Sequence, residues 1–428
     1  MTHARALVGW VALGSTLALA VACRAPQRAQ VTEVELWAMG REGELVGRLL
    51  PDFERRHPRI RVRVQQVPWS AAHEKLLTAY VGGAMPDVVQ VGSTWVPELV
   101  ALGALLPLDE RVARSAVVNR ADYFEGILDA HAVGGRTYSL PWYVDTRVLF
   151  YRTDLLARAG HATPPATWDG WLQAMERLAA PPERWALFVS STDWWLPVTL
   201  GLQRGATLLR DDGRFGNFRS APMREAFALY LDLFRRGLAP RAGASEVANL
   251  HQDFAAGYFA VFPSGPWDLG ELARRLPPDL ADRWGTAPMP GNGPDRPGVS
   301  IAGGAGLAVA ADSPRADEAW ALVEYLATPA SQVALHRLTG DLPARRSAWR
   351  LAGLHDDPHL AAFWQQLGHL VSVPKVAEWE RIADALGRHA DAAVRGEVTA
   401  AAALAALDRD VDAMLEKRRW LLARGRLP

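Results

Sequence analysis

Residues 31–92 alternate between two kinds of hydrophobic spacing, and this alternation restricts the possible fold more than any other feature of the chain. Three stretches have the pattern of strands: VTEVELWAM (31–39), RIRVRVQQVP (59–68) and MPDVVQVG (85–92). The two stretches between them have helical spacing: GELVGRLLPDFERRHP (43–58) and WSAAHEKLLTAYVGG (69–83). Strand, helix, strand, helix, strand is typical of a parallel sheet with right-handed crossovers, so we expect an α/β fold.

The rest of the chain is richer in helix. We expect helices in TWDGWLQAMERLAAP (167–181), APMREAFALYLDLFRRG (221–237), 316–326 and 363–422, and strands in RWALFVS (184–190) and VSIAGGAGLAVAAD (299–312). A chain of 428 residues exceeds what one hydrophobic core usually supports. Two domains are therefore the expected organisation.

The N-terminus resembles a bacterial lipoprotein signal. His3 and Arg5 precede LVGWVALGSTLALAVA (7–22), and Cys23, the single cysteine of the chain, follows it. Ala20 stands where such signals usually carry Leu. We expect residues 1–23 to be the signal, Cys23 to be lipidated, and 24–31 to be a linker. No later stretch is apolar over the length that a bilayer needs, so we expect the membrane to be reached through the lipid alone.

Charge and motif content exclude several classes of protein. Acidic and basic residues number 47 each, which argues against a nucleic-acid partner. The basic residues near the end (417–426) solvate a terminal helix or contact a membrane surface. The chain contains no GxxxxGK[ST], HExxH or GxSxG motif. In HDDPH (355–359) we expect Asp357 to cap a helix that begins at Pro358 rather than a metal site. No metal, cofactor or catalytic group is expected.

Tryptophan residues beside polar residues suggest a carbohydrate site. Seventeen tryptophans is a high count, and several stand at strand ends: Trp37, Trp95, Trp194, Trp195 and Trp267. Sugar rings stack on indoles with their CH faces, and their hydroxyls need carboxylate, guanidinium or amide partners. The apolar stretch LPWYVDTRV (140–148) likewise carries Tyr143, Asp145 and Arg147. Core packing is the alternative for any one tryptophan, whereas the set as a whole favours a sugar cleft.

Several motifs together resemble the family-1 extracellular solute-binding proteins, the maltose-binding-protein-like receptors of bacterial ATP-binding-cassette (ABC) sugar importers. FYRTDLL (150–156) resembles the Y-N-x-D-L signature, with Arg152 in place of Asn. The other similar segments are MPDVVQV followed by ELVALGALLPLDE (98–110), FAAGYFAVFPSGPW (254–267), residues 315–349 with a TG-x-LP turn, and VRGEVTAAAALAAL (394–407). The resemblance covers nearly all of the chain beyond the linker.

The resemblance implies a two-lobe periplasmic-binding-protein fold of type II, with ligand held in a cleft between lobes and several strands crossing between them. The first lobe is expected to hold residues 32–144 and 300–341, and the second 145–299 and 342–428. LPWYVDTRV is then the first crossing.

The resemblance also implies the site residues. Asp145 falls where the family presents an acidic residue to sugar hydroxyls, and Trp379 where it carries a stacking aromatic. The Asp193–Trp195 loop also carries aromatics in such proteins, with its alignment open by a residue or two, and Arg345 and Arg346 follow a later crossing, or else solvate a turn. The expected ligand-binding residues are Trp37, Arg41, Glu42, Ser93, Thr94, Trp95, Tyr143, Asp145, Asp193, Trp194, Trp195, Trp267, Gly304, Arg345 and Trp379.

The implied function is that of a monomeric, lipid-anchored receptor in the bacterial cell envelope, in the periplasm or on the outer face of the cytoplasmic membrane. It binds a sugar of oligosaccharide size and delivers it to the permease subunits of an ABC importer, without catalysis. Two alternatives stay open. One keeps the fold and binds a phosphorylated polyol or another anion through the arginines. The other is a lipid-anchored glycoside hydrolase, which needs two carboxylates on either side of one bond.

Overall fold

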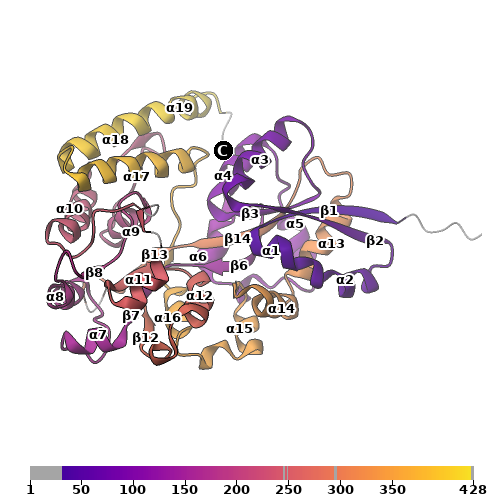
Figure 1. Cartoon of the computed structure of the whole chain (residues 1–428). Helices are drawn as coiled ribbons and strands as arrows, with labels where there is room; N and C mark the ends of the chain where they lie inside the picture. The colour runs from indigo at the N-terminus through magenta and orange to yellow at the C-terminus, as the bar shows by residue number, and fades with distance from the viewer. Residues whose placement is uncertain (1–30, 244–245, 248, 294–295, 426–428) are drawn as a thin grey trace, which may run out of the picture.

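The protein consists of two lobes that lie side by side, each built around its own sheet (Figure 1). The structure is a computed structural model that describes residues 31–243, 246–247, 249–293 and 296–425. The expected signal, Cys23 and most of the linker therefore lie outside the described residues. Within the described ranges, no helix combines the length and the apolar character that crossing a bilayer requires.

The first lobe has a six-stranded sheet in the order β15-β6-β14-β3-β1-β2. Its strands are β1 (Thr32–Met39), β2 (Ile60–Val67), β3 (Val88–Gly92), β6 (Leu140–Asp145), β14 (Gly303–Val309) and β15 (Leu342–Pro343). β1 runs parallel to β2 and β3, which confirms the pattern predicted from residues 31–92. β14 runs antiparallel to both β3 and β6, so the complete sheet is mixed.

The helices of the first lobe cover both faces of this sheet. They are α1 (Gly40–Leu45), α2 (Leu50–Arg56), α3 (Trp69–Val81), α4 (Val96–Leu102), α5 (Asp109–Arg114), α6 (Glu125–Ala130), α13 (Ala316–Leu326), α14 (Pro329–Thr339) and α15 (Arg346–Ala352). The single helix expected over 43–58 is instead α1, a 3-10 turn (Val46–Arg48) and α2. Pro51 lies in the first turn of α2, where its missing N–H costs no hydrogen bond, and it therefore starts a helix instead of continuing one.

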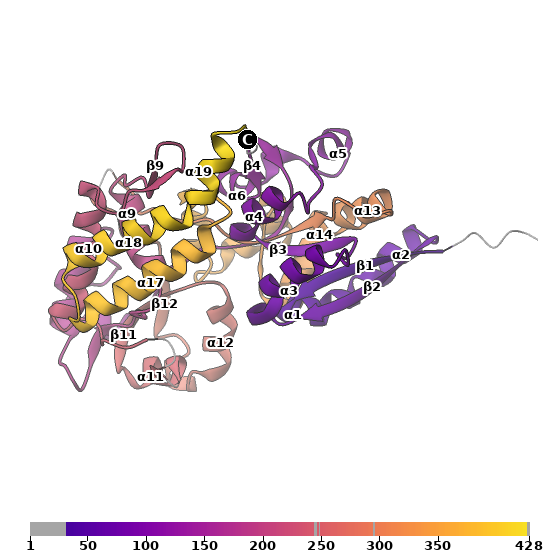
Figure 2. The ribbon, with the colours of Figure 1, turned by 90° about the horizontal axis from the view of Figure 1, so that it is seen from above.

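The second lobe has a four-stranded sheet in the order β12-β7-β11-β8. Its strands are β7 (Val148–Arg152), β8 (Trp185–Leu187), β11 (Phe259–Ser264) and β12 (Trp284–Ala287). Its helices are α7 (Thr153–Arg158), α8 (Trp168–Leu178), α9 (Trp195–Gln203), α10 (Ala221–Arg235), α11 (Leu250–Ala256), α12 (Trp267–Arg275), α16 (Ala361–Gln366), α17 (Trp379–Arg395), α18 (Ala400–Met414) and α19 (Glu416–Leu422). Figure 2 shows α17 and α18 side by side across the near face of the second lobe.

Short strand pairs complete the fold. They are β4 (Ala132–Val133) with β5 (Arg136–Thr137), β9 (Leu209–Arg210) with β10 (Phe215–Gly216), and β13 (Ser300–Ile301) with β16 (Leu370–Val371). β13 and β14 together replace the single strand expected over 299–312. The helical tail expected over 363–422 is interrupted between α16 and α17 by β16 and the turn after it. No helix begins at Pro358; Asp357 accepts a hydrogen bond from the His359 N–H, and α16 begins at Ala361.

The chain crosses between the two sheets through very short links. β6 ends at Asp145 in the first sheet and β7 begins at Val148 in the second, so Thr146 and Arg147 alone connect them. This agrees with the crossing expected at LPWYVDTRV. The expected boundary at residue 341 needs correction, because β15 lies in the first sheet and α15 packs against α14. The first lobe therefore extends to about the end of α15, since strand pairing and helix packing hold residues 342–352 there.

Candidate functional site

A cavity of about 950 Å³ lies between the two lobes. The first lobe contributes the loops that follow β1 and β3, and the second lobe contributes the start of α12. The strands β6 and β14 contribute their ends at the crossing. Eleven of the expected ligand-binding residues line the cavity: Arg41, Glu42, Ser93, Thr94, Trp95, Tyr143, Asp145, Trp194, Trp195, Trp267 and Gly304.

Two glycines make room for Asp145 at the crossing. Gly303 pairs with Asp145 across the two strands, and a Cβ atom on Gly303 would come within 1.9 Å of the Asp145 Oδ1. Gly304 has a φ of +108°, a conformation that side chains other than glycine rarely adopt. Burial raises the pKa of Asp145 to about 6, although the nearby Arg147 guanidinium lowers it. At neutral pH Asp145 is thus an ionised acceptor at the cavity wall.

The first-lobe wall of the cavity is aromatic. Trp69, at the start of α3, and Trp95, directly after β3, lie with their ring centroids 5.5 Å apart. Behind them, the His73 Nε2 lies 2.7 Å from a carboxylate oxygen of Glu98, and this hydrogen bond raises the pKa of His73. The ring of Trp95 lies over Gly92, where an added Cβ atom would come within 3.3 Å of it. These indoles offer apolar faces suited to stacking.

The second-lobe wall presents Trp267, whose side chain is 51% exposed. Its ring lies over Gly265, since a Cβ atom there would come within 2.1 Å of the indole. Asp268 holds the start of α12 in place, because its buried carboxylate accepts a hydrogen bond from the Ser264 hydroxyl and lies 2.6 Å from the His251 Nε2. The SGPW segment (264–267) therefore positions one exposed indole, that of Trp267, at the cavity.

Arg147 joins the crossing to the second lobe. Its guanidinium lies 3.6 Å from the Asp193 carboxylate and 4.9 Å from the centroid of the Trp195 ring. Asp193 in turn accepts a hydrogen bond of 2.9 Å from the backbone N–H of Trp195. Asp193 thus orients the Arg147 and Trp195 side chains, which line the cavity, although Asp193 itself is not part of the lining.

A comparison with protein families decides which family this architecture represents. Residues 41–333, more than half of the chain, match the family described as bacterial extracellular solute-binding protein. The chain belongs to this family.

Solved relatives of this solute-binding protein agree with it in fold, and a curated relative is similar to it in sequence. The sugar-binding protein MalE from the phytopathogen Xanthomonas citri is 43% identical, with a TM-score of 0.88 over 92% of this chain and 99% of that chain. The GacH receptor of Streptomyces glaucescens, solved unliganded and with acarbose, is 23% identical, with a TM-score of 0.78 over 90% of this chain and 99% of that chain. The diacetylchitobiose binding protein DasA of Streptomyces coelicolor is 24% identical over 336 residues, 78% of this chain and 77% of DasA.

Two expected site tryptophans of the solute-binding protein lie elsewhere. Trp379 is 1% exposed in the core of the second lobe, where Trp194 packs edge-on against it at 5.4 Å. Trp37 is buried under Lys75, whose Nζ lies 4.3 Å from the ring centroid, and its indole N–H donates to Glu35. Neither residue lines the cavity, so the expectation that they contact ligand directly is corrected.

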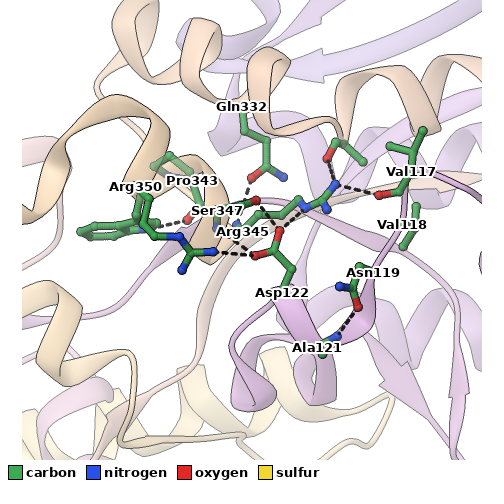
Figure 3. Close-up of polar contacts among 12 residues, drawn as sticks. Val117, Val118, Asn119, Ala121, Asp122, Gln332, Pro343, Arg345, Ser347 and Arg350 are labelled. Atoms are coloured by element: carbon green, nitrogen blue, oxygen red, sulfur yellow. Dashed lines mark hydrogen bonds and ion pairs between the residues drawn. The ribbon is translucent and has the colours of Figure 1, made fainter.

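Arg345 also lies away from the cavity, in a buried polar cluster of the first lobe (Figure 3). Its Nε donates to Asp122 at 2.7 Å, and its Nη1 donates to the carbonyls of Val117 and Ala327 at 3.0 and 3.1 Å. Its backbone N–H donates to Gln332. The Nε and Nη1 groups of the guanidinium thus tie the segment after β15 to the first lobe, which corrects the expected ligand-binding role of Arg345.

The structure adds lining residues that are missing from the list of expected ligand-binding residues, among them Trp69, Arg147, Thr339 and Asp341. Trp69 follows the carboxyl end of β2, so its position at a strand end matches that of the tryptophans named in the sequence analysis. Asp341 lies in the TG-x-LP turn. The cavity holds both charge signs, and no group of three or more His, Cys, Asp or Glu side chains within the described ranges is arranged to hold a metal ion.

Proposed function

We propose that this solute-binding protein binds a neutral sugar of oligosaccharide size in the cavity and delivers it to the permease of an ABC importer. The observation that carries the proposal is the pairing of exposed indoles on both walls with the partly buried carboxylate of Asp145 at the crossing. Indoles stack on the apolar faces of sugar rings, and the carboxylate accepts hydrogen bonds from hydroxyls. A volume of about 950 Å³ gives room for more than one ring.

The named relatives support the class of ligand. MalE is described as sugar-binding, GacH has been solved with acarbose, and DasA is named for diacetylchitobiose. On this proposal no bond is made or broken in the cavity. Ligand that contacts both walls shifts the lobes toward a closed arrangement, and the permease recognises that arrangement.

A titration panel tests the proposal. We expect maltotetraose or diacetylchitobiose to bind in calorimetry at neutral pH, and Asp145→Asn to weaken that binding by about 1.5–3 kcal/mol, the range for a hydrogen bond to a charged group. Glycerol 3-phosphate serves as the anionic comparison, because four arginines line the cavity: Arg41, Arg147, Arg274 and Arg337. Salt-sensitive binding of the phosphate alone would favour the anion-binding alternative. Release of reducing sugar that Asp145→Asn abolishes would favour a hydrolase.

We further propose that Cys23 carries a lipid that holds the mature protein at the membrane. The support is the position of this single cysteine at the end of a secretory stretch. In cells that process lipoproteins, wild-type protein should fractionate with membranes, and Cys23→Ser should move it to the soluble fraction and remove the acyl mass. Wild-type protein without lipid mass, or a variant that stays with the membrane, would contradict this.

A further inference from the structure

Two carboxyl groups meet at one side of the cavity, Glu42 from α1 and Asp341 from the turn after α14. The two helices pack against each other, which brings these side chains together. Glu42 is 6% exposed, and Asp341 is partly buried. The Glu42 Oε2 and the Asp341 Oδ2 are both buried, and neither receives a hydrogen bond from any donor in the part of the chain that the structure describes.

Within the described residues, Glu42 and Asp341 form no ion pair, although the charges of His336 and Arg41 oppose the burial that raises the pKa of Asp341. Two buried carboxylates in contact repel each other, and the repulsion is relieved when one of them takes up a proton and hydrogen-bonds to the other. The two side chains are close enough to hydrogen-bond each other once one of them is protonated.

The charged and titratable groups that face the pair come from three elements. Arg41 precedes Glu42 on α1, His336 lies on α14, and Tyr143 and Asp145 lie on β6. Arg147, just beyond β6, acts on Asp145 rather than on the pair. Arg41 uses its Nη2 on the Leu338 carbonyl, and the His336 Nδ1 lies 2.9 Å from the Asp341 carbonyl oxygen. Burial raises the pKa values of both carboxyls and outweighs the neighbouring side chains that lower them. Those neighbours include Thr339, His336 and Arg41 for Asp341, and Trp69 for Glu42.

We propose that Glu42 and Asp341 share one proton and together present a donor and an acceptor to a hydroxyl-bearing, uncharged ligand. This inference rests on the proposed function, and it adds that the site binds an uncharged, hydroxyl-bearing ligand through the shared proton. The protonated carboxyl donates to a hydroxyl or ring oxygen of the ligand, and the ionised carboxyl accepts from a neighbouring hydroxyl. An amine on the ligand would displace the shared proton instead of using it.

Electrostatics at the pair agree with this arrangement. Burial raises the pKa of Glu42 to about 8, and repulsion from Asp341 adds to the effect. Burial also raises the pKa of Asp341. The proton is thus held at neutral pH and lost as the pH rises past about 8. Because the native state holds a proton that the unfolded chain has released, the stability contributed by Glu42 is present at low pH and lost as the pH rises through that value.

The shared proton is tested first without ligand. Infrared spectroscopy at pH 7 should show a protonated carboxyl band that both Glu42→Gln and Asp341→Asn remove. Glu110→Gln is the matched control, because that side chain is 88% exposed and lies outside this cavity. Glu42→Gln should also raise the melting temperature more at pH 9 than at pH 5. A wild-type spectrum without the band at pH 7, or one that Glu42→Gln leaves unchanged, would overturn the proposal.

Binding tests the use of the proton. Diacetylchitobiose and its deacetylated form, chitobiose, are a matched neutral and cationic pair, and maltotetraose is a second neutral probe. The affinity for the neutral probe that binds should fall by roughly tenfold between pH 7 and pH 9, and Glu42→Gln should abolish this fall. An affinity that does not change with pH, or tighter binding of chitobiose with proton release, would overturn the inference while leaving sugar binding intact. Failure of every sugar would instead overturn the proposed function, while the infrared result still decides whether the proton is shared.

Discussion

Replacing Arg345 with methionine is expected to lower the free energy of unfolding by about 3–5 kcal/mol, the usual cost of removing one partner of a buried ion pair. The Arg345 and Asp122 side chains are 7% and 10% exposed, and the change leaves the carboxylate without its cation. It also leaves the carbonyls of Val117 and Ala327 without their donor. Chemical denaturation followed by tryptophan fluorescence measures this loss.

Arg350 is a matched control, because it faces the same carboxylate from solvent. Its Nη2 lies 4.0 Å from Asp122, and its side chain is 64% exposed, so Arg350→Met should change stability by no more than about 1 kcal/mol. Equal losses for the two variants would contradict the view that burial makes Arg345 important. Ligand affinity should survive in folded Arg345→Met protein, since Arg345 does not line the cavity.

The pH dependence of this loss follows from Asp122. Burial pushes the pKa of Asp122 upward, but hydrogen bonds from Ser347 and Arg345 outweigh burial, and the pKa lies below its ordinary value. A carboxyl whose pKa is lowered by folding stabilises the protein at pH values above its pKa in the unfolded chain. This stabilisation is lost as the pH falls through the pKa of the folded protein. The difference between wild type and Arg345→Met should therefore narrow below about pH 3.9.

Trp379→Ala is expected to destabilise the ligand-free protein by roughly 3–5 kcal/mol, the range for removing an aromatic side chain from a core. The indole is 1% exposed among the apolar side chains of the second lobe, and its removal leaves a cavity beside Trp194. Thermal and denaturant unfolding of the ligand-free variant measure the effect.

Trp267→Ala is the comparison that separates a core tryptophan from a ligand-binding one. Trp267 is 51% exposed at the cavity, so its removal should leave stability within about 0.5 kcal/mol of wild type. It should weaken binding of the sugar identified by the titration panel by about 2 kcal/mol or more, as for a central aromatic contact. If Trp267→Ala unfolded early and bound normally, the stacking role would be wrong.

Periodicity predicted β1, β2, β3, α3 and α13 of the first lobe because the apolar residues of each recur at strand or helix spacing. The single helix expected over 43–58 differs from the structure, because Pro51 begins a new helix inside an unbroken apolar pattern. The antiparallel placement of β14 and β15 depends on contacts between segments more than 150 residues apart, and local spacing carries no information about these.

For the site, the sequence indicated which residue types to expect, and the fold decided which of them reach the cavity. Trp267 and Trp379 look alike in sequence, since each stands at the first position of a helix. The ring of Trp267 lies over Gly265 at the cavity, whereas Trp379 packs inward from α17. Arg345 follows a crossing as expected, but its guanidinium pairs with the carboxylate of Asp122, 223 residues earlier in the chain. Such pairings depend on the complete fold.

The two-residue link between β6 and β7 has a consequence for how motion of this protein can be measured. Two residues span at most about 7 Å, so the two sheets cannot move far apart at this point. The relative motion of the lobes there is a rotation about the link. Reporters near Thr146 would record almost nothing, whereas reporters on exposed positions such as Val81, at the end of α3, and Val398, between α17 and α18, would record the full swing. Because Cys23 is the single cysteine of the sequence, thiol-reactive spin labels or fluorophores can be placed at such sites without first removing a native thiol from either lobe.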